Sequence, residues 1–103
     1  EVRAVVGVDP GVTGALAVVV EGRLVAVLDM PTNEGRADGH ELHEILESVA
    51  LGADTYVFVE DTQPMPKNGS IASFKLGLNT GVVLGVIQSM SLPLRRVRPS
   101  DWK

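Results

Sequence analysis

Cysteine is absent from the 103 residues of this chain, which excludes a disulfide-bonded scaffold, thiolate metal ligands and a cysteine nucleophile. The absence fits a reducing compartment, so we expect a cytoplasmic protein. No apolar run reaches the roughly 18 residues that a membrane span needs, and no basic segment followed by an apolar core marks a signal peptide. Hydrophobic residues make up 45% of the chain and charged residues 21%. This composition excludes a mainly disordered chain and is typical of a globular domain.

The charged residues are unevenly distributed along the chain. Residues 1–61 carry twelve acids against three arginines, a net charge of −9, and residues 62–103 carry six bases against one acid, a net charge of +5. Such a division suits an enzyme that holds cations with one surface and phosphates with another. A solvated surface with uneven charge would give the same count, so charge alone does not decide between the two.

Alternating and β-branched residues predict strands, and residues at helical spacing predict helices. The expected strands are residues 2–8, 15–20, 24–28, 55–60 and 94–97, and the expected helices are about 42–52 and 70–90. Residues 29–39 read as a polar loop. The order β-β-β-α-β-α-β predicts an α/β fold with a mixed five-stranded sheet, in which the first, fourth and fifth strands are parallel and helices cover the faces. We find no repeat and no second domain, so residues 1–103 form a single domain.

Two carboxylates end neighbouring strands of this sheet. Asp9 and Glu60 follow the first and fourth strands, which lie about 4.8 Å apart, so both carboxylates reach one cation or a close pair of cations. Hard oxygen ligands select Mg²⁺, or Mn²⁺, over zinc. Taken alone, Asp9 is also a common turn residue before Pro-Gly. Asp61 points to the opposite face, and His40 and His43 have no third ligand in view, so we read these three as accessory or solvent-facing.

The loop from Asp9 to Gly14 offers a second possible site. Two glycines, a hydroxyl and free backbone N–H groups would let a phosphate approach the backbone closely. A plain hairpin turn has the same composition, so both interpretations stand.

Three glycines recur every four residues on the second helix: Gly77, Gly81 and Gly85. Each costs about 1 kcal/mol of helix propensity relative to alanine, so some contact should offset them. We rank tight packing on the sheet first, and a two-fold dimer contact or a surface against DNA second.

Basic and aromatic residues near this helix are candidates for contacts with DNA. Lys67 and Lys75 flank the helix start, where the backbone also favours phosphate. Phe74 is read first as a core residue and second as an aromatic wedge against an unpaired base. Arg95, Arg96 and Arg98 alternate across the last strand, where they would grip phosphate or protect a sheet edge.

Four segments together resemble the RuvC Holliday junction resolvases. They are Val6-Gly-Val-Asp-Pro-Gly-Val-Thr-Gly-Ala15, Val57-Phe-Val-Glu60, Lys75-Leu-Gly77 continuing through Gly81 and Gly85, and Val97-Arg-Pro-Ser-Asp-Trp-Lys103. Phage-type members are the most similar, through Asp61-Thr-Gln-Pro-Met-Pro-Lys67 and the ending Arg-Pro-x-x-Trp-Lys. The first segment occurs in other ribonuclease H-like proteins, whereas the combination is more specific.

The resemblance implies a ribonuclease H-like fold and a crossover junction endodeoxyribonuclease that depends on Mg²⁺. It also implies a homodimer that cuts branched DNA symmetrically in the bacterial cytoplasm, or in the host cytoplasm if the protein is phage-encoded. Asp9 and Glu60 match the first two metal ligands and catalytic residues of the family, and the glycine-bearing helix matches the region that serves the dimer and the junction. The family has further acids on a helix after the last strand, and Asp101 is too close to that strand to replace them. We therefore expect a domain that is incomplete at its C-terminus and whose activity needs those acids.

Two other functions fit the same pattern of elements. One is the phosphate-binding half of an actin-like or sugar-kinase-like ATPase, which needs a second domain to close over ATP. The other is a non-catalytic module that binds DNA through the glycine-bearing helix.

Overall fold

The computed structural model describes residues 1–11, 13–61 and 69–98. The elements of these residues are, in chain order, β1 (Arg3–Val8), β2 (Ala15–Val20), β3 (Arg23–Asp29), β4 (Thr32–Asn33), β5 (Arg36–Ala37), α1 (Gly39–Ala50), β6 (Asp54–Glu60), α2 (Ser70–Ser89) and β7 (Leu94–Val97). The five predicted strands and two predicted helices all form, with ends within a few residues of the prediction.

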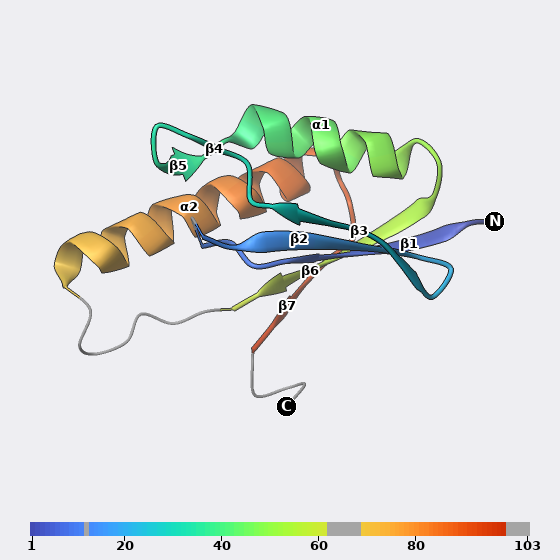
Figure 1. Cartoon of the computed structure of the whole chain (residues 1–103), viewed down its shortest axis with the longest axis horizontal. Helices are drawn as coiled ribbons and strands as arrows, with labels where there is room; N and C mark the ends of the chain where they lie inside the picture. Colours follow the sequence, from blue (N-terminus) through green and yellow to red (C-terminus); the bar gives the residue numbers. More distant parts are fainter. Residues whose placement is uncertain (12, 62–68, 99–103) are drawn as a thin grey trace.

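The main sheet has the strand order β3-β2-β1-β6-β7 (Figure 1). β1 is antiparallel to β2 and parallel to β6, and β6 is parallel to β7. The predicted mixed five-stranded α/β sheet is confirmed. The pairing of β1 with β6 matters most for function, because it brings the carboxyl ends of two strands far apart in sequence to the same edge.

The turn between β2 and β3 is the two-residue hairpin that Glu21-Gly22 predicts. Glu21 has φ 50° and Gly22 has φ 78°, a left-handed pair that matches the twist of the flanking strands. This tight turn sets the register of β3 on β2, with one irregularity between Val18 and Val19.

The hydrophobic core lies on one face of the sheet only. Strand residues at alternate positions meet the two helices there: Val6, Val8, Leu16, Val18, Val57 and Val59 pack with Leu42, Leu46, Val83 and Ile87. Burying each such side chain stabilises the fold by about 1.5–3 kcal/mol. Both helices therefore cover the same face (Figure 1), so among the described residues the helices that flank the sheet lie on one side of it. The other face leaves apolar side chains in solvent, among them Leu24, Val27 and Phe58.

The segment after β3 was expected to be a polar loop, but it contains a second small hairpin. β4 and β5 pair through Thr32–Ala37 and Asn33–Arg36 around a turn in which Glu34 and Gly35 have positive φ. The backbone N–H of Ala37 donates a 3.0 Å hydrogen bond to Oδ1 of Asn79 on α2. Two-residue strands have no periodic pattern, and this one is held by a contact with a helix 42 residues away.

Helix α2 is apolar on all sides, and only Asn79, Val83 and Ile87 are buried. It begins after Gly69, without a capping side chain or an acid in the first turn. By length and composition it could cross a membrane: an 18-residue window has mean hydropathy 1.5 and is 17% buried. This differs from the expectation of no such run, although core helices of soluble proteins pass the same test. Most of the surface of this apolar helix is therefore uncovered.

Candidate metal site at the carboxyl ends of β1 and β6

Asp9 lies directly after β1, where the chain turns into β2. The backbone N–H of Asp9 donates to the carbonyl of Ala15 at 2.9 Å, which closes the loop at the base of the hairpin. The backbone N–H of Gly11 donates to Oδ1 of Asp9 at 3.2 Å, so one carboxylate oxygen is oriented by its own turn. The side chain is exposed and available to a ligand.

Gly14 closes the same loop from the other side. A Cβ at this position would overlap the backbone carbonyl of Asp9, so only glycine fits here. The N–H of Gly14 bonds to the carbonyl of Gly11 at 2.9 Å, and its own carbonyl accepts from Met30 at 2.9 Å. Close packing against the turn explains this glycine without a bound phosphate.

Glu60 ends β6, one residue beyond the parallel pair Val8–Val59. Val8 and Val59 are both buried under the helices, so Asp9 and Glu60, the next residues of each strand, face the opposite, uncovered side. Adjacent strands are about 4.8 Å apart, so the pairing of β1 with β6 places the two residues at neighbouring strand ends, as predicted. That both carboxylates reach one cation stays a prediction.

A cavity of about 410 Å³ lies in front of this pair. Its lining is Gly7, Val8, Asp9, Ala15, Ala17, Phe58, Glu60 and Val97. The small residues of β1 and β2 leave the space, and Phe58 forms an apolar wall that sequence reasoning missed. The two carboxylates are the charged groups of an otherwise apolar hollow.

The donor chemistry of the pair fits a hard divalent cation. Carboxylate oxygens are the ligands that Mg²⁺ and Mn²⁺ prefer, and neither histidine lines the cavity. Within residues 1–11, 13–61 and 69–98, no group of three potential ligands comes together. Asp101 lies outside the described residues. Among the described residues, Asp9 and Glu60 are the two carboxylates that line the cavity.

Asp61 does not join this pair. Its carboxylate forms a 2.7 Å ion pair with the guanidinium of Arg96 on the face of the sheet opposite to Glu60. The pair gives Arg96 a structural partner, and the role of Asp61 as an accessory or capping residue stays a prediction. Arg95 and Arg98 are exposed at the edge strand β7 and its exit.

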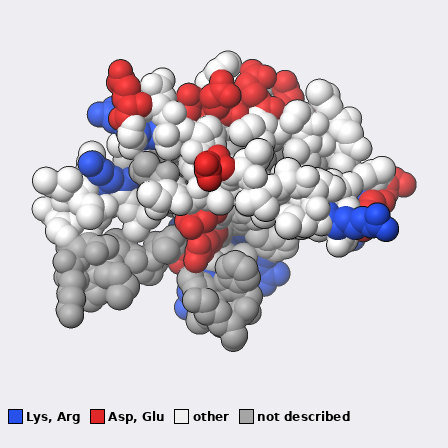
Figure 2. Space-filling view, in the orientation of Figure 1, with Lys and Arg blue, Asp and Glu red and all other residues white. Residues whose placement is uncertain are grey.

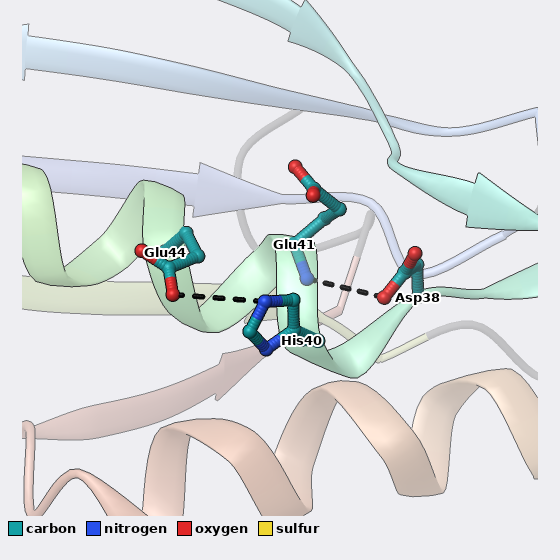
Figure 3. A network of polar contacts seen from close by, with 4 residues as sticks. All are labelled: Asp38, His40, Glu41 and Glu44. Atoms are coloured by element: carbon teal, nitrogen blue, oxygen red, sulfur yellow. Dashed lines mark hydrogen bonds and ion pairs between the residues drawn. The ribbon is translucent and has the colours of Figure 1, made fainter.

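The histidines of α1 belong to a solvated, acidic helix surface. Asp38 caps the helix, with Oδ1 accepting from the N–H of Glu41 at 3.1 Å, and Nε2 of His40 lies 3.7 Å from Oε1 of Glu44 (Figure 3). His43 is half-buried. Acidic side chains gather over α1 in Figure 2.

The candidate DNA-binding residues of α2 lie on its exposed first half. Phe74 is 70% exposed, so the interpretation as a core residue is wrong. Phe74 and Lys75 line a groove of about 620 Å³ against the β4–β5 hairpin, together with Arg36 and Asn79. Sequence reasoning missed Arg36 and Asn79; the signal for Asn79 was a single amide in the middle of an apolar helix. Lys67 lies outside the described residues.

The three glycines of α2 do not pack on the sheet. Gly77, Gly81 and Gly85 are exposed, and a Cβ added at any of them would have no neighbour within 4 Å among the described residues. The interpretation ranked first, tight packing within this domain, is therefore wrong. A contact with a second molecule stays a prediction.

Comparisons with known proteins identify the architecture. No protein-family model matches the sequence, and no curated protein matches it. The structure of Thermus thermophilus RuvC in complex with a Holliday junction substrate superposes with a TM-score of 0.65 at 21% identity, over 95% of this chain and 66% of that chain. The chain has the RuvC fold. A second structure of Thermus thermophilus RuvC gives a TM-score of 0.63 at 24% identity, over 93% of this chain and 64% of that chain. This chain thus spans about two thirds of the length of the RuvC chains it matches.

Proposed function

We propose that this chain is the nuclease domain of a Mg²⁺-dependent endonuclease that cleaves branched DNA such as Holliday junctions. The observation that carries the proposal is the position of Asp9 and Glu60, which share one face and one cavity at the tips of adjacent parallel strands. The RuvC fold supports it, since the similar Thermus protein is seen with a Holliday junction substrate.

Asp9 and Glu60 would hold the cation. When bound, Mg²⁺ or Mn²⁺ supplies activation of water and stabilisation of the leaving oxygen in phosphodiester hydrolysis. This chain orients one oxygen of Asp9 through the N–H of Gly11, and Phe58 forms one apolar wall of the cavity. We also propose that further acids beyond β7 complete the ligand set, as the resemblance to RuvC implies.

Two side chains of the described residues would position the DNA backbone. Lys75 lies on the exposed first half of α2, and Arg98 follows Val97, which pairs with Glu60. Lys67 would add a cation before α2. Contacts of this kind hold phosphates without reading bases, as cleavage directed by branch geometry requires.

A homodimer would place two such sites on opposite strands of a junction. The support for an α2 contact is the exposed glycine surface of Gly77, Gly81 and Gly85, which lets another backbone approach closely. The apolar character of α2, with most of its surface uncovered, points to the same contact.

The test combines metal binding with cleavage. Calorimetry with Mn²⁺ and cleavage of an end-labelled four-way junction are measured for the parent chain and for Asp9→Asn and Glu60→Gln. We expect both substitutions to abolish metal binding and any cleavage. Asp29→Asn is the matched control. Asp29 is an exposed acid of β3 that pairs with Ala15 of β2 at the same end of the sheet, and it lies outside the cavity.

Other outcomes would contradict the nuclease. Mn²⁺ binding that survives both substitutions would remove the metal site. Junction binding that is unchanged in Asp9→Asn, in a chain that binds no metal, would favour the non-catalytic module. Calorimetric binding of ATP that Asp9→Asn abolishes would favour the phosphate-binding alternative.

A further inference from the structure

The groove between the β4–β5 hairpin and α2 contains a buried amide with unused donors. Asn79 is 2% exposed. The backbone N–H of Ala37 can only donate, so Asn79 must present its oxygen to it at 3.0 Å, which fixes the orientation of the amide. The Nδ2 group then has two donors and no acceptor among the described residues. Buried donors are almost always paired, so this group at the groove wall calls for an acceptor in the groove, from water or from a ligand.

The rest of the groove is apolar on one wall and basic at its rim. Ile71 and Phe74 are 73% and 70% exposed and stand one turn apart on α2. Arg36 from β5 and Lys75 from α2 bring two cations to the same groove. Figure 2 shows basic side chains at this end of the molecule, above the grey region. The start of α2 adds N–H groups that no side chain caps.

These groups match the parts of one nucleotide. An aromatic ring stacks on a base of any identity, a buried amide donates to acceptors on the edge of a base, and paired cations hold a phosphodiester. We propose that the groove binds one unpaired nucleotide of a DNA strand, with the base against Phe74, the base edge at Asn79 and the phosphate between Arg36 and Lys75.

Glu34, which also lines the groove, favours a strand over a free nucleotide. A phosphodiester carries one negative charge, whereas the terminal phosphate of a mononucleotide carries nearly two, and a nearby carboxylate repels the second more strongly.

The groove lies at the same end of the sheet as the metal site. β3 runs parallel to β1, and its last residue, Asp29, pairs with Ala15 beside the Asp9 loop; the hairpin follows immediately. Figure 1 shows the hairpin and the start of α2 at this end. The inference rests on the proposed function, because branched DNA offers unpaired nucleotides; the groove lies on the helix-covered side of the sheet, whereas Asp9 and Glu60 face the uncovered side.

The experiment measures fluorescence anisotropy of a labelled oligothymidylate without divalent metal, in the Asp9→Asn background. Phe74→Ala removes the stacking surface from an exposed position, and we expect about tenfold weaker binding. Asn79→Asp keeps the oxygen for Ala37 and replaces the donors by a carboxylate oxygen, and we expect a similar loss. Leu51→Ala is the matched control: Leu51 is 83% exposed at the end of α1, and its loss should leave affinity unchanged.

Three results would overturn the proposal. Phe74 is exposed, so Phe74→Ala should fold as the parent chain does. Unchanged affinity of this variant for the oligonucleotide would show that the nucleotide does not bind in the groove. Free thymidine monophosphate that competes as well as the oligonucleotide would assign the groove to free nucleotides. Sedimentation that shows Ile71→Ser breaking a dimer, with no change in oligonucleotide affinity, would assign it to a second copy of this chain.

The two proposals fail separately. If Asp9→Asn abolishes Mn²⁺ binding and junction cleavage while Phe74→Ala leaves oligonucleotide affinity unchanged, the nuclease proposal stands and the groove proposal fails. If Phe74→Ala weakens oligonucleotide binding tenfold in a chain that does not bind metal, the groove proposal stands and the nuclease proposal fails.

Discussion

The carboxylate of Asp61 and the guanidinium of Arg96 meet at 2.7 Å on the face of the sheet opposite to Glu60. The backbone repeats the link, because the N–H of Asp61 donates to the carbonyl of Val97 at 2.7 Å. The residue after Glu60 is thus held to β7 by side chain and backbone together. This pair keeps the tip of β6 in place next to the Asp9 loop, and it engages Arg96, which sequence reasoning offered as a phosphate contact.

Removing this pair should loosen the tip of β6 at modest cost. We expect Asp61→Asn and Arg96→Gln each to lower the free energy of unfolding by about 0.5–1 kcal/mol, since both side chains are partly exposed. The double variant should lose little more than either single one, because the two substitutions remove the same interaction. Urea denaturation measures this coupling. Arg95→Gln on the neighbouring residue is the control, and strictly additive losses would contradict a direct pair.

Gly14 should be the least replaceable glycine of the metal-site loop. We expect Gly14→Ala to destabilise the fold by roughly 1–3 kcal/mol, because the new methyl group would overlap the carbonyl of Asp9. Gly11→Ala is the matched control, since its Cβ would lie 3.6 Å from Oδ1 of Asp9, an ordinary contact. Urea denaturation compares the two, and equal stability of both variants would show that the loop adjusts freely.

Replacing Gly77 with alanine should stabilise the fold. Its Cβ position is open among the described residues, so Gly77→Ala should raise the free energy of unfolding by about 0.8–1.0 kcal/mol through helix propensity alone. Thermal denaturation at low protein concentration measures this gain. A loss of stability would mean that another surface packs closely on this glycine.

Gly81 tests the proposed dimer. A leucine at this position projects from the exposed face of α2 and would hold a second backbone away, so Gly81→Leu should give monomers in sedimentation velocity. Gly52→Leu adds the same side chain at another exposed, open position outside α2 and should leave the oligomeric state unchanged. A Gly81→Leu variant that stays dimeric would exclude this face as the contact.

Local sequence patterns were sufficient to predict the main strands and to place Asp9 beside Glu60. The β-branched runs of β1 and β6 define the strands, and parallel strands end at the same edge. Each carboxylate follows its strand directly, so the fold topology alone brings them together. Their role as metal ligands stays a prediction.

Helix α2 shows where local patterns were insufficient. Its residues are apolar on every side, so no periodicity distinguished the buried side from the exposed one. The ranking of Phe74 as a core residue and of the glycines as packing residues followed from that ambiguity. Only the docking of α2 beside α1, on the face already buried by β1 and β6, decided which residues remain in solvent.

The positions of the main-sheet strands, and the carboxylates that follow β1 and β6, were therefore determined by the sequence itself, since the alternation that defines a strand is a local property. The tertiary structure alone decided three features: the single covered face of the sheet, the β4–β5 hairpin held by Asn79, and the ion pair of Asp61 with Arg96. Each depends on side chains from segments distant in sequence, whose meeting is governed by packing and register rather than by any pattern within one segment.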